Sequence, residues 1–434
     1  MQPVLHDPAR LETIFDDDHA VANAGLALVA VLSQALGIEA AADDVIDLGG
    51  RPAASRPGRK ILTLVHSMAV GGDCIDDVDV LRSGSTDRVL GHRVMAPSTC
   101  GIFLRSFTFG HVRQLDRLFD TVLARAWAAG AGPGDEAMTI DLDSTICDVH
   151  GYQKQGAEYG YTKQLGYHPL VATRADTGEV LHIRQRRGSA HTARGTKRFI
   201  AEFVARLRRA GASGALTLRA DAGFYAWETI TTLKDRQVAF SITVPKNPAV
   251  VAAIATIRDK AWIRIGYPNG GIADVGEICY KGERLIVRRT RNTTNNEQGV
   301  LFDDWEYHAF ITNREGDATF LDADHRRHAV VELAIRDWKE GSAGNHAPSG
   351  IYAANAAWVV LAALAHNLIR WVAALGLGVD GPVVTKTIRR RLITLPGRIT
   401  TRSRRYILHL PTRWPWETDF LTATHRLQGL PRLC

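Results

Sequence analysis

The order of secondary-structure patterns between residues 138 and 244 constrains the fold of this chain more than any other feature of its sequence. An alternating strand that begins at 138 and ends at Asp143 opens the region, and two further alternating runs within 168–188 are joined by Asp176-Thr177-Gly178, which is a hairpin signal. The patterns that follow are a helix at 196–211, a strand at 216–221, a helix at 227–236 and a strand at 238–244. This succession predicts a mixed α/β sheet with flanking helices.

The regions on either side of this core differ from it in pattern. Residues 107–127 place apolar side chains on one stripe of a helix, with Thr108 available as its N-cap. Between 248 and 320 the sequence turns β-rich and irregular, and a helical pattern resumes at 325–341. The stretch 48–60 is rich in Gly, Pro and Arg, which is typical of a basic linker or loop. A chain of 434 residues with these changes of pattern is expected to hold more than one domain.

The chain carries an excess of positive charge, and this excess is concentrated near its C-terminus. The formal net charge is +7. Residues 386–434 contain ten Arg and one Lys against one Glu and one Asp. Basic surfaces of this kind are typical of proteins that bind a polyanion. The tail is therefore a candidate phosphate-contacting surface, with a solvated basic face as the alternative.

The cysteines and the apolar stretches predict an intracellular protein without a membrane span. The five cysteines, Cys434 among them, are scattered and free of CxxC spacing, as expected for reduced thiols rather than a disulfide framework or a zinc site. Residues 1–20 are acidic where a signal peptide requires a basic and then an apolar region. Residues 356–379 are apolar but are interrupted by His366, Asn367 and Arg370, which favours a buried helix.

Two aspartates on the strand at 138–144 raise a specific question. Side chains alternate between the two faces of a strand, so Asp141 and Asp143 share one face while the apolar side chains share the other. A buried carboxylate without a partner is costly, so a cation, hydrogen bonds or solvent must compensate for it. Asp143 lies at the end of its strand, and Asp221 ends a later strand. Ligands of open α/β sheets bind beyond the carboxyl ends of strands.

A third acid, Glu332, lies on the helix predicted at 325–341. The polar stripe of this helix consists of His325, His328, Glu332 and Lys339. Docking of the opposite, apolar stripe would bring Glu332 towards Asp143 and Asp221. Convergent carboxylates repel one another unless a cation lies between them, and all-oxygen ligands favour Mg²⁺ or Mn²⁺. In this interpretation Asp143 is a metal ligand and Asp141 a structural partner, whereas the two histidines are either further ligands or surface residues that face DNA.

Three motifs resemble those of the DDE transposases, whose catalytic core is ribonuclease-H-like. They are IDLDST (140–145), LRADAGFY (218–225) and the helix with Glu332 and Lys339. In one branch of these enzymes the glutamate lies in a Tyr-x2-Arg-x3-Glu-x6-Lys helix, and here His325 and His328 replace the Tyr and the Arg. The segments 71–82, 94–116 and 388–416 are similar to segments of the transposase family named after insertion sequence 1380.

This resemblance implies a fold class and a domain organisation. The fold class is α/β, with a ribonuclease-H-like core interrupted by a β-rich insert, a helical N-terminal region and a basic C-terminal region. The implied domains are a helical DNA-binding region at 1–135, the first part of the core at 136–247, the insert at 248–320, the second part of the core at 321–380 and the basic region at 381–434.

The resemblance also implies a reaction and its site. Asp143, Asp221 and Glu332 would hold two Mg²⁺ ions, with Mn²⁺ as a substitute, and would cleave the ends of an insertion sequence and join them to target DNA. The implied DNA-binding residues are Lys339, His325, His328, Arg389, Arg390, Arg391, Arg404 and Arg405. The expected partners are double-stranded DNA, namely terminal inverted repeats and target, and a second copy of the chain in a synaptic homodimer. The expected location is the bacterial cytoplasm, at the nucleoid.

Two other functions are compatible with the same residues. A ribonuclease-H-like nuclease without strand transfer would share the three acids. A catalytically inactive, transposase-derived protein would bind DNA without cutting it, although the presence of all three acids argues against this alternative. Joining of cut ends to a target separates these possibilities.

Overall fold

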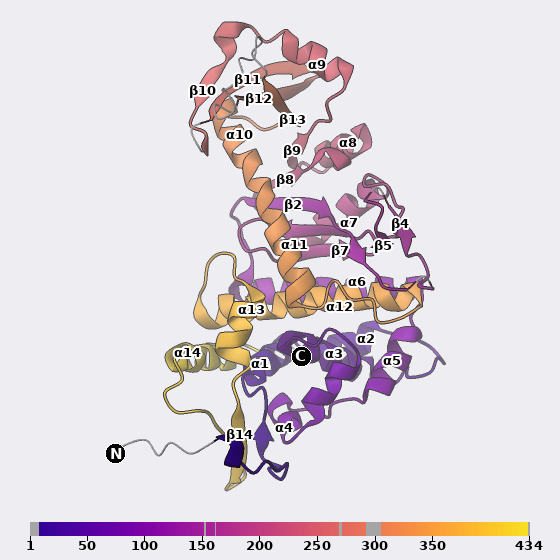
Figure 1. The fold of residues 1–434 in the computed structure, drawn as a ribbon, viewed down its shortest axis with the longest axis vertical. Helices are drawn as coiled ribbons and strands as arrows, with labels where there is room; N and C mark the ends of the chain where they lie inside the picture. Colours follow the sequence, from indigo (N-terminus) through magenta and orange to yellow (C-terminus); the bar gives the residue numbers. More distant parts are fainter. Residues whose placement is uncertain (1–7, 152, 161, 269–270, 292–304, 433–434) are drawn as a thin grey trace.

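The computed structural model describes residues 8–151, 153–160, 162–268, 271–291 and 305–432, and Cys434 lies outside these ranges. The molecule is elongated (Figure 1). Helices from both ends of the chain form the lower part of the view, the strands of the predicted core lie in the middle, and the strands β10–β13 form the upper end.

Within the described residues, nine strands form one mixed sheet in the order β10-β11-β12-β13-β9-β8-β2-β6-β7. The first five in chain order are β2 (Met138–Ser144), β6 (Leu170–Arg174), β7 (Val180–Arg184), β8 (Leu216–Ala220) and β9 (Ala239–Thr243). Strand β2 pairs antiparallel with β6 and parallel with β8, and β8 pairs parallel with β9. The mixed α/β class predicted from the sequence is therefore confirmed.

The helices beside these strands follow the predicted order closely. Helix α7 (Thr196–Arg209) ends before Gly211, whose φ is 108°, and α8 (Trp227–Asp235) connects β8 to β9. The predicted helices and the strands at 216–221 and 238–244 agree with the structure to within two residues at each end, whereas the second run of the hairpin, predicted to reach 188, ends at Arg184. The turn of the β6–β7 hairpin is also where the Asp176-Thr177-Gly178 signal placed it, with Gly178 at a φ of 71°.

The β-rich region extends the same sheet. Its strands are β10 (Ile263–Ile265), β11 (Ile272–Tyr280), β12 (Glu283–Arg291) and β13 (Glu306–Thr312), preceded by helix α9 (Pro248–Ala255). Strand β13 pairs antiparallel with β9, with Phe310 opposite Thr243 and Thr312 opposite Ser241. The sequence correctly indicated β structure here, but it gave no sign that these strands continue the core sheet.

The helical pattern near residue 325 is divided into two helices. Helix α10 (Ala318–Arg326) begins at an Asp317 cap, whose side chain accepts a hydrogen bond from Thr319 N. A 3-10 turn at Arg327–Ala329 then leads into α11 (Val330–Gly341). The prediction of one helix at 325–341 was therefore wrong at its start. It followed the apolar stripe of α11 and missed the Asp317 cap.

The first and last regions of the chain pack together. The N-terminal helices are α1 (Leu26–Ala35), α2 (Ile38–Val45), α3 (Pro57–Val70), α4 (Thr86–Leu90), α5 (Pro97–Arg105) and α6 (Phe109–Ala126), and α6 has the predicted Thr108 cap. The C-terminal elements are α13 (Thr385–Ile388), β14 (Gly397–Arg402), β15 (Arg405–His409) and α14 (Glu417–Gln428). Strand β1 (Ala20–Val21) pairs with β14, and Gly25 N donates to Ile393 O. A Cβ at Gly25 would lie 1.7 Å from Leu392 O, so this contact requires glycine.

Two smaller groups of strands complete the described elements. The hairpin β14–β15 and β1 form a three-stranded sheet. Strands β3 (Cys147–Asp148), β4 (Glu158–Tyr159) and β5 (Leu165–Tyr167) form another beside the end of β2. The second sheet includes β3, which follows β2, the strand that carries Asp141 and Asp143.

The most apolar helix, α12 (Tyr352–Trp371), lies inside the molecule. By length and composition it could cross a membrane, yet nearly all of its most apolar stretch is buried against other parts of the chain. Its polar residues hold the β6–β7 hairpin. Asn367 accepts from Val180 N at 2.9 Å and donates to Val180 O at 2.8 Å, while Arg370 donates to Thr177 O at 2.7 Å. The buried helix predicted from the sequence is confirmed, and the residues that interrupt it have backbone partners.

We predict that Asn367→Leu lowers the free energy of unfolding by about 2–4 kcal/mol, because it leaves the buried Val180 N–H and C=O groups without partners. Denaturant titration followed by circular dichroism measures this change. Asn345→Leu is the matched control, since Asn345 is exposed and its side chain makes no hydrogen bond in the described structure. Its effect should stay within about 0.5 kcal/mol. Equal losses in both variants would contradict the role given to Asn367.

Candidate active site

The parallel pairing of β2 with β8 determines which charged side chains meet. Asp141 lies opposite Arg219, and Leu142 lies opposite Ala220. Continuing this register by one residue brings Asp143 beside Asp221, where both strands end. The pairing therefore places the oppositely charged Asp141 and Arg219 inside the molecule, and the carboxylates of Asp143 and Asp221 at the C-terminal ends of the two strands.

Asp141 is a buried carboxylate with several partners. Its Oδ1 accepts from Arg219 Nε at 2.8 Å, and its Oδ2 accepts from an Arg219 terminal nitrogen at 2.9 Å. His328 Nδ1 lies 2.9 Å from Asp141 Oδ1, and Arg219 also donates to Asp324 O at 2.7 Å. Only about 1% of the Asp141 side chain is exposed, so these contacts replace the water that would otherwise solvate its charge.

Asp143 lacks a cationic partner of this kind. Its Oδ1 accepts from Ser144 N at 2.6 Å, and no ion pair involves it among the residues that the structure describes. The pKa of Asp143 is raised to about 6, chiefly by burial. The carboxylates of Asp221 and Glu332 also raise it, whereas the Ser144 N–H and the nearby His328 lower it. The strand register places Asp221 beside Asp143, and Glu332 follows four residues after His328, which contacts Asp141 on the same strand, so the three acids lie in the same part of the molecule.

Asp221 and Glu332 are the exposed members of this group. Asp221 caps the 3-10 helix Ala222–Phe224 and accepts from Gly223 N at 2.9 Å. Glu332 lies in the first turn of α11, a helix that contacts both β2 and β6. Neither acid forms an ion pair within the described ranges, so their oxygens are accessible to a ligand.

The three carboxylates are not drawn into a tight cluster. Within the described part of the chain, one group of three possible metal ligands has all its ligand atoms within 4.8 Å of one another. That group is Asp73, Cys74 and Asp77, on a surface loop, and it does not include the three acids of the site. Asp77 Oδ2 accepts there from the backbone N–H groups of Asp73 and Cys74, so that loop is explained by its own hydrogen bonds. The carboxylates of Asp143, Asp221 and Glu332 are spread more widely than 4.8 Å.

The two histidines of the predicted polar stripe have different surroundings. His328 contacts Asp141, as described above. His325 stacks on Phe310 at a centroid distance of 4.1 Å, and its ring nitrogens lie 2.7 Å from Ser241 Oγ and 3.0 Å from Thr243 Oγ1. The pKa of His325 is lowered to about 3, chiefly by burial and also by nearby His328 and arginines. This geometry favours a packing role for His325 over the predicted DNA contact or metal ligation.

Lys339 lies next to the segment that follows β2. Its Nζ donates to Ile146 O at 2.6 Å and lies 3.4 Å from Thr145 Oγ1. The same segment is held from the other side by His168, whose Nδ1 donates to Ala190 O and whose Nε2 accepts from Ser144 Oγ at 2.9 Å. The end of β2 that carries Asp143 is thus fixed by hydrogen bonds on both sides.

Arg219 is the site residue that sequence reasoning missed. A signal for it was present, because both β2 and β8 carry a charged residue two positions before the terminal aspartate. If the two strands are parallel and in register, the Asp141 of one must lie against the Arg219 of the other. The compensation that Asp141 required is therefore an arginine on the neighbouring strand, and not a metal ion.

The family model described as "Transposase DDE domain group 1" matches residues 5–432. The chain belongs to the DDE transposase family. No functionally curated protein matches the sequence. Among solved structures, it is similar to the piggyBac transposase in a synaptic complex with hairpin DNA, with a TM-score of 0.46 and 12% identity over 86% of this chain and 79% of that one.

Arg389, the first of the predicted C-terminal arginines, makes hydrogen bonds within the protein. Arg389 Nε donates to Ala69 O at 2.8 Å, and its terminal nitrogen donates to Met68 O at 3.2 Å and to Gly341 O. These carbonyls belong to the C-terminal ends of α3 and α11, where an arginine is electrostatically favoured. The geometry favours a structural role for Arg389 over the predicted DNA contact.

The other predicted arginines are exposed. Arg390 is exposed, and the Arg391 guanidinium lies 5.5 Å from the centre of the Trp416 ring. Arg404 and Arg405 lie at the tip of the β14–β15 hairpin, which is at the opposite end of the molecule from the β10–β13 strands (Figure 1). Their contact with DNA stays a prediction for this transposase.

We predict that Arg219→Leu lowers the free energy of unfolding by about 3–5 kcal/mol, because it removes the bidentate partner of the buried Asp141. Calorimetry or denaturant titration measures the change. Arg327→Leu is the control, since Arg327 is exposed on the 3-10 turn and forms no ion pair among the described residues. A loss below about 1 kcal/mol for Arg219→Leu would show that the pair is not the main compensation for Asp141.

We predict that Asp143→Asn, unlike Arg219→Leu, raises the free energy of unfolding of the metal-free protein. The folded protein binds a proton at Asp143 more tightly than the unfolded chain, so stability falls as the pH rises from about 4 to about 6. At about pH 8 in a chelator, Asp143→Asn should therefore raise stability by about 1–2 kcal/mol, allowing for its partial exposure. Thermal unfolding measures this effect, with the exposed Asp148→Asn as a control. Destabilisation by Asp143→Asn would mean that the carboxylate makes a net favourable interaction.

Proposed function

We propose that this DDE transposase binds the terminal inverted repeats of an insertion sequence, cleaves its ends and joins them to target DNA by two-metal phosphoryl transfer. The observation that carries the proposal is the position of Asp143, Asp221 and Glu332. Three acids from two parallel strand ends and one helix converge there without a cationic side chain to neutralise them. Carboxylates arranged in this way repel one another unless cations bind between them.

We further propose that the core is ribonuclease-H-like. The support is the arrangement around β2, which has an antiparallel hairpin, β6–β7, on one side and two parallel strands, β8 and β9, on the other. Helix α11 contacts β2 and β6 and presents Glu332 from its first turn. The strands β10–β13 would then be an elaboration on the edge of this core.

The residues present fit a pair of divalent cations. The donors are carboxylate oxygens, which Mg²⁺ and Mn²⁺ prefer, and none of the three acids forms an ion pair among the residues that the structure describes. Asp143, Asp221 and Glu332 would hold the ions. When bound, these ions would activate the attacking oxygen and stabilise the leaving oxygen of the phosphodiester.

The remaining side chains of the site position these ligands. The Ser144 and Gly223 N–H groups orient the carboxylates of Asp143 and Asp221. The Asp141–Arg219 pair joins the two strands just inside the site. Lys339, which holds the segment after β2, would exchange its carbonyl partner for a phosphate of the bound DNA.

The proposal also defines the partners of the protein. Two ends of the element must be held together before they are joined, which favours a synaptic homodimer on double-stranded DNA. We place the protein in the bacterial cytoplasm, where the nucleoid is accessible. A nuclease without strand transfer and an inactive DNA-binding derivative are the alternatives, and both are outcomes of the experiment below.

We predict that Asp143→Ala, Asp221→Ala and Glu332→Ala each lower DNA cleavage at least about 10³-fold while leaving DNA affinity nearly unchanged, because these residues act on metal and not on phosphate recognition. Purified protein is incubated with Mg²⁺ and DNA that carries the flanking inverted repeats, and cleavage and joining are scored separately. Glu340→Ala, which removes an exposed acid from the same helix, is the matched control.

The same assay separates the alternatives. Cleavage without joining would assign a nuclease, and binding without cleavage in every condition would assign an inactive derivative. Activity should be supported by Mg²⁺ or Mn²⁺ and lost in excess chelator, with Ca²⁺ permitting binding but little chemistry. Full activity in excess chelator would contradict the two-metal mechanism.

A further inference from the structure

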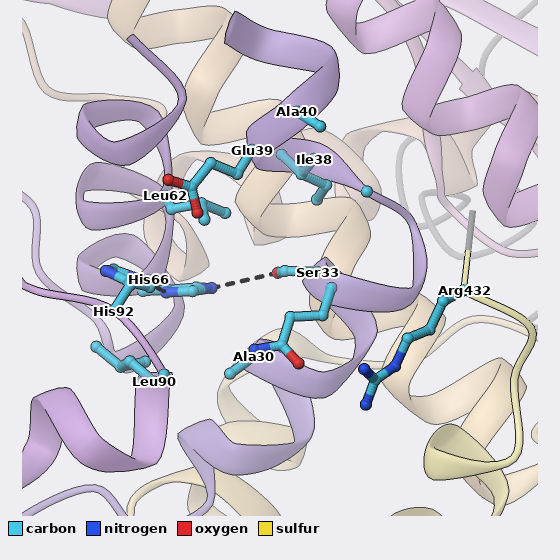
Figure 2. A pocket seen from close by; sticks show the side chains of 13 residues that line it. Ala30, Ser33, Ile38, Glu39, Ala40, Leu62, His66, Leu90, His92 and Arg432 are labelled. Carbon is cyan, nitrogen blue, oxygen red and sulfur yellow. Dashed lines mark hydrogen bonds between the residues drawn. The ribbon is translucent and has the colours of Figure 1, made fainter. Parts of the chain in front are cut away.

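Buried polar side chains in the N-terminal helices are paired with one another, as Figure 2 shows in part. His92 Nδ1 lies 3.2 Å from Arg93 O, and a carbonyl can only accept, so His92 donates there and its Nε2 accepts from His66 Nδ1 at 3.1 Å. His66 Nε2 then accepts from Ser33 Oγ at 3.2 Å. Each of these three side chains is therefore satisfied within the protein.

The edge strand β15 differs from this interior, because part of its backbone has no partner. The sheet order β1-β14-β15 leaves β15 (Arg405–His409) paired on one side alone, with β14. The turn between the two strands consists of Ser403 and Arg404, whose φ values of 48° and 64° are typical of a type I′ turn. The strand pair that closes such a turn exchanges both of its backbone hydrogen bonds, and here that pair is Arg402 and Arg405.

The direction of each backbone group along β15 follows from this turn. Bonded and non-bonded pairs alternate along antiparallel strands, so the backbone of Ile407 faces β14, whereas Tyr406 and Leu408 turn their N–H and C=O groups away from it. One hydrogen bond agrees with this alternation: Ile399, which lies opposite Leu408, donates its N–H to His19 O on the other side of β14. The outward groups of Tyr406 and Leu408 have no partner among the residues that the structure describes.

The side chains of β15 are apolar in the middle of the strand and exposed to solvent. Tyr406 is 65% exposed and Ile407 is 38% exposed, on opposite faces of the strand. Exposed edge strands are usually protected by Pro, Lys, a bulge or a covering element. Strand β15 contains neither Pro nor Lys, its register with β14 is continuous, and no described strand pairs with its free edge. An uncovered apolar edge of this kind is a template for another strand.

The free edge of β15 is complementary to the same edge of a second copy. In an antiparallel pair centred on Ile407, Tyr406 of each copy lies opposite Leu408 of the other, and each such pair exchanges both of its N–H···O=C bonds. A shift of two residues would place Leu408 opposite Arg404, or Tyr406 opposite Leu410, and both of these positions lie outside the strand. A shift of one residue would turn each unpaired group towards one that is already bonded to β14.

The same pairing keeps the arginines of the two hairpins apart. Because the paired strands run in opposite directions, Arg405 lies opposite His409 of the other copy and about 14 Å along the strand from that copy's Arg405. Ile407 meets its counterpart on the two-fold axis, and Tyr406 packs across from Leu408, so the central contacts on both faces are apolar. The side chains thus agree with the register that the backbone groups require.

We propose that β15 pairs with β15 of a second copy of the chain and so joins the two small sheets into one, in the order β1-β14-β15-β15-β14-β1. The inference deepens the proposed function by giving the expected homodimer a contact surface, and it rests on that function only for the use of the dimer in holding two DNA ends. A pair of strands of this length buries less than about 1,000 Å², so the association is reversible and depends on protein concentration. The hairpin lies at one end of the elongated molecule, where a second copy can approach it (Figure 1).

The test places a cysteine on the two-fold axis of the proposed pair. The two Ile407 Cα atoms would be about 4.5 Å apart, a separation that a disulfide spans, so Ile407→Cys should form a disulfide between copies under mild oxidation. The full chain is used in a background of Cys74→Ser, Cys279→Ser and Cys434→Ser, which leaves the two buried cysteines in place. Non-reducing electrophoresis measures the linked dimer at increasing protein concentration, without DNA and with an inverted-repeat duplex.

Matched variants separate this edge from other contacts. Thr401→Cys places the thiol at an exposed position of β14 in the same hairpin, where two copies of it would be more than about 14 Å apart and should form no disulfide. Tyr406→Pro removes an N–H that faces away from β14, so it spares the hairpin but should lower the association constant about 10-fold in sedimentation velocity. Tyr406→Val, which keeps that N–H, is its control and should weaken association less.

The outcomes distinguish this inference from the proposed function. Linkage through Ile407→Cys but not through Thr401→Cys would support the pairing, and it decides the question alone if Tyr406→Pro unfolds. Equal linkage of both cysteine variants would place the contact elsewhere, and the absence of linkage through Ile407→Cys, with or without DNA, would exclude the pairing, so both results overturn the inference. Because linkage is scored independently of cleavage, a protein that links through Ile407→Cys but never cuts DNA would overturn the proposed function and leave the pairing intact.

Discussion

The buried pair between Asp141 and Arg219 is the interaction on which the rest of the site depends. It joins the central strand β2 to β8, and through His328 and Asp324 it reaches the connection between α10 and α11. Removing either charge would leave the other without compensation in the interior. Because the pair sets the relative position of two strands and one helix, it also sets where Asp143, Asp221 and Glu332 can meet. Because this pair joins the strands, the acids at the strand ends need not stabilise the fold and are free to bind a ligand.

Local patterns predicted local structure well and long-range contacts poorly. The alternation and helical periodicity between 138 and 244 located the helices α7 and α8 and the strands β8 and β9 to within two residues, because these signals depend on neighbours in sequence. The pairing of β13 with β9, which continues the sheet, depends on residues about 70 apart and left no local mark. For the site, the three acids were named from position and resemblance. The Arg219 partner of Asp141 required the strand register, which the sequence does not state.

The arginines show why charge alone is a weak guide to function. The run beginning at Arg389 looked like a phosphate-binding surface, yet that residue binds the carbonyls at the ends of two helices. The stretch at 48–60 was interpreted only as a basic linker, yet it places Arg56 in the wall of a cleft, where the Arg56 side chain forms no ion pair within the described part of the chain. What decides between these roles is the set of groups around each guanidinium, and that set is assembled from segments far apart in the chain.

The pairing of the first and last described regions has a consequence for synthesis. The close approach of Gly25 to Leu392 and Ile393 cannot form until both have left the ribosome. At about 5–20 residues per second, this interval is roughly 20–70 s, during which α1 lacks its packing partner α14. The N-terminal helical region therefore matures last, although its residues are made first. A prematurely terminated chain would contain these helices without the segments that complete their surroundings.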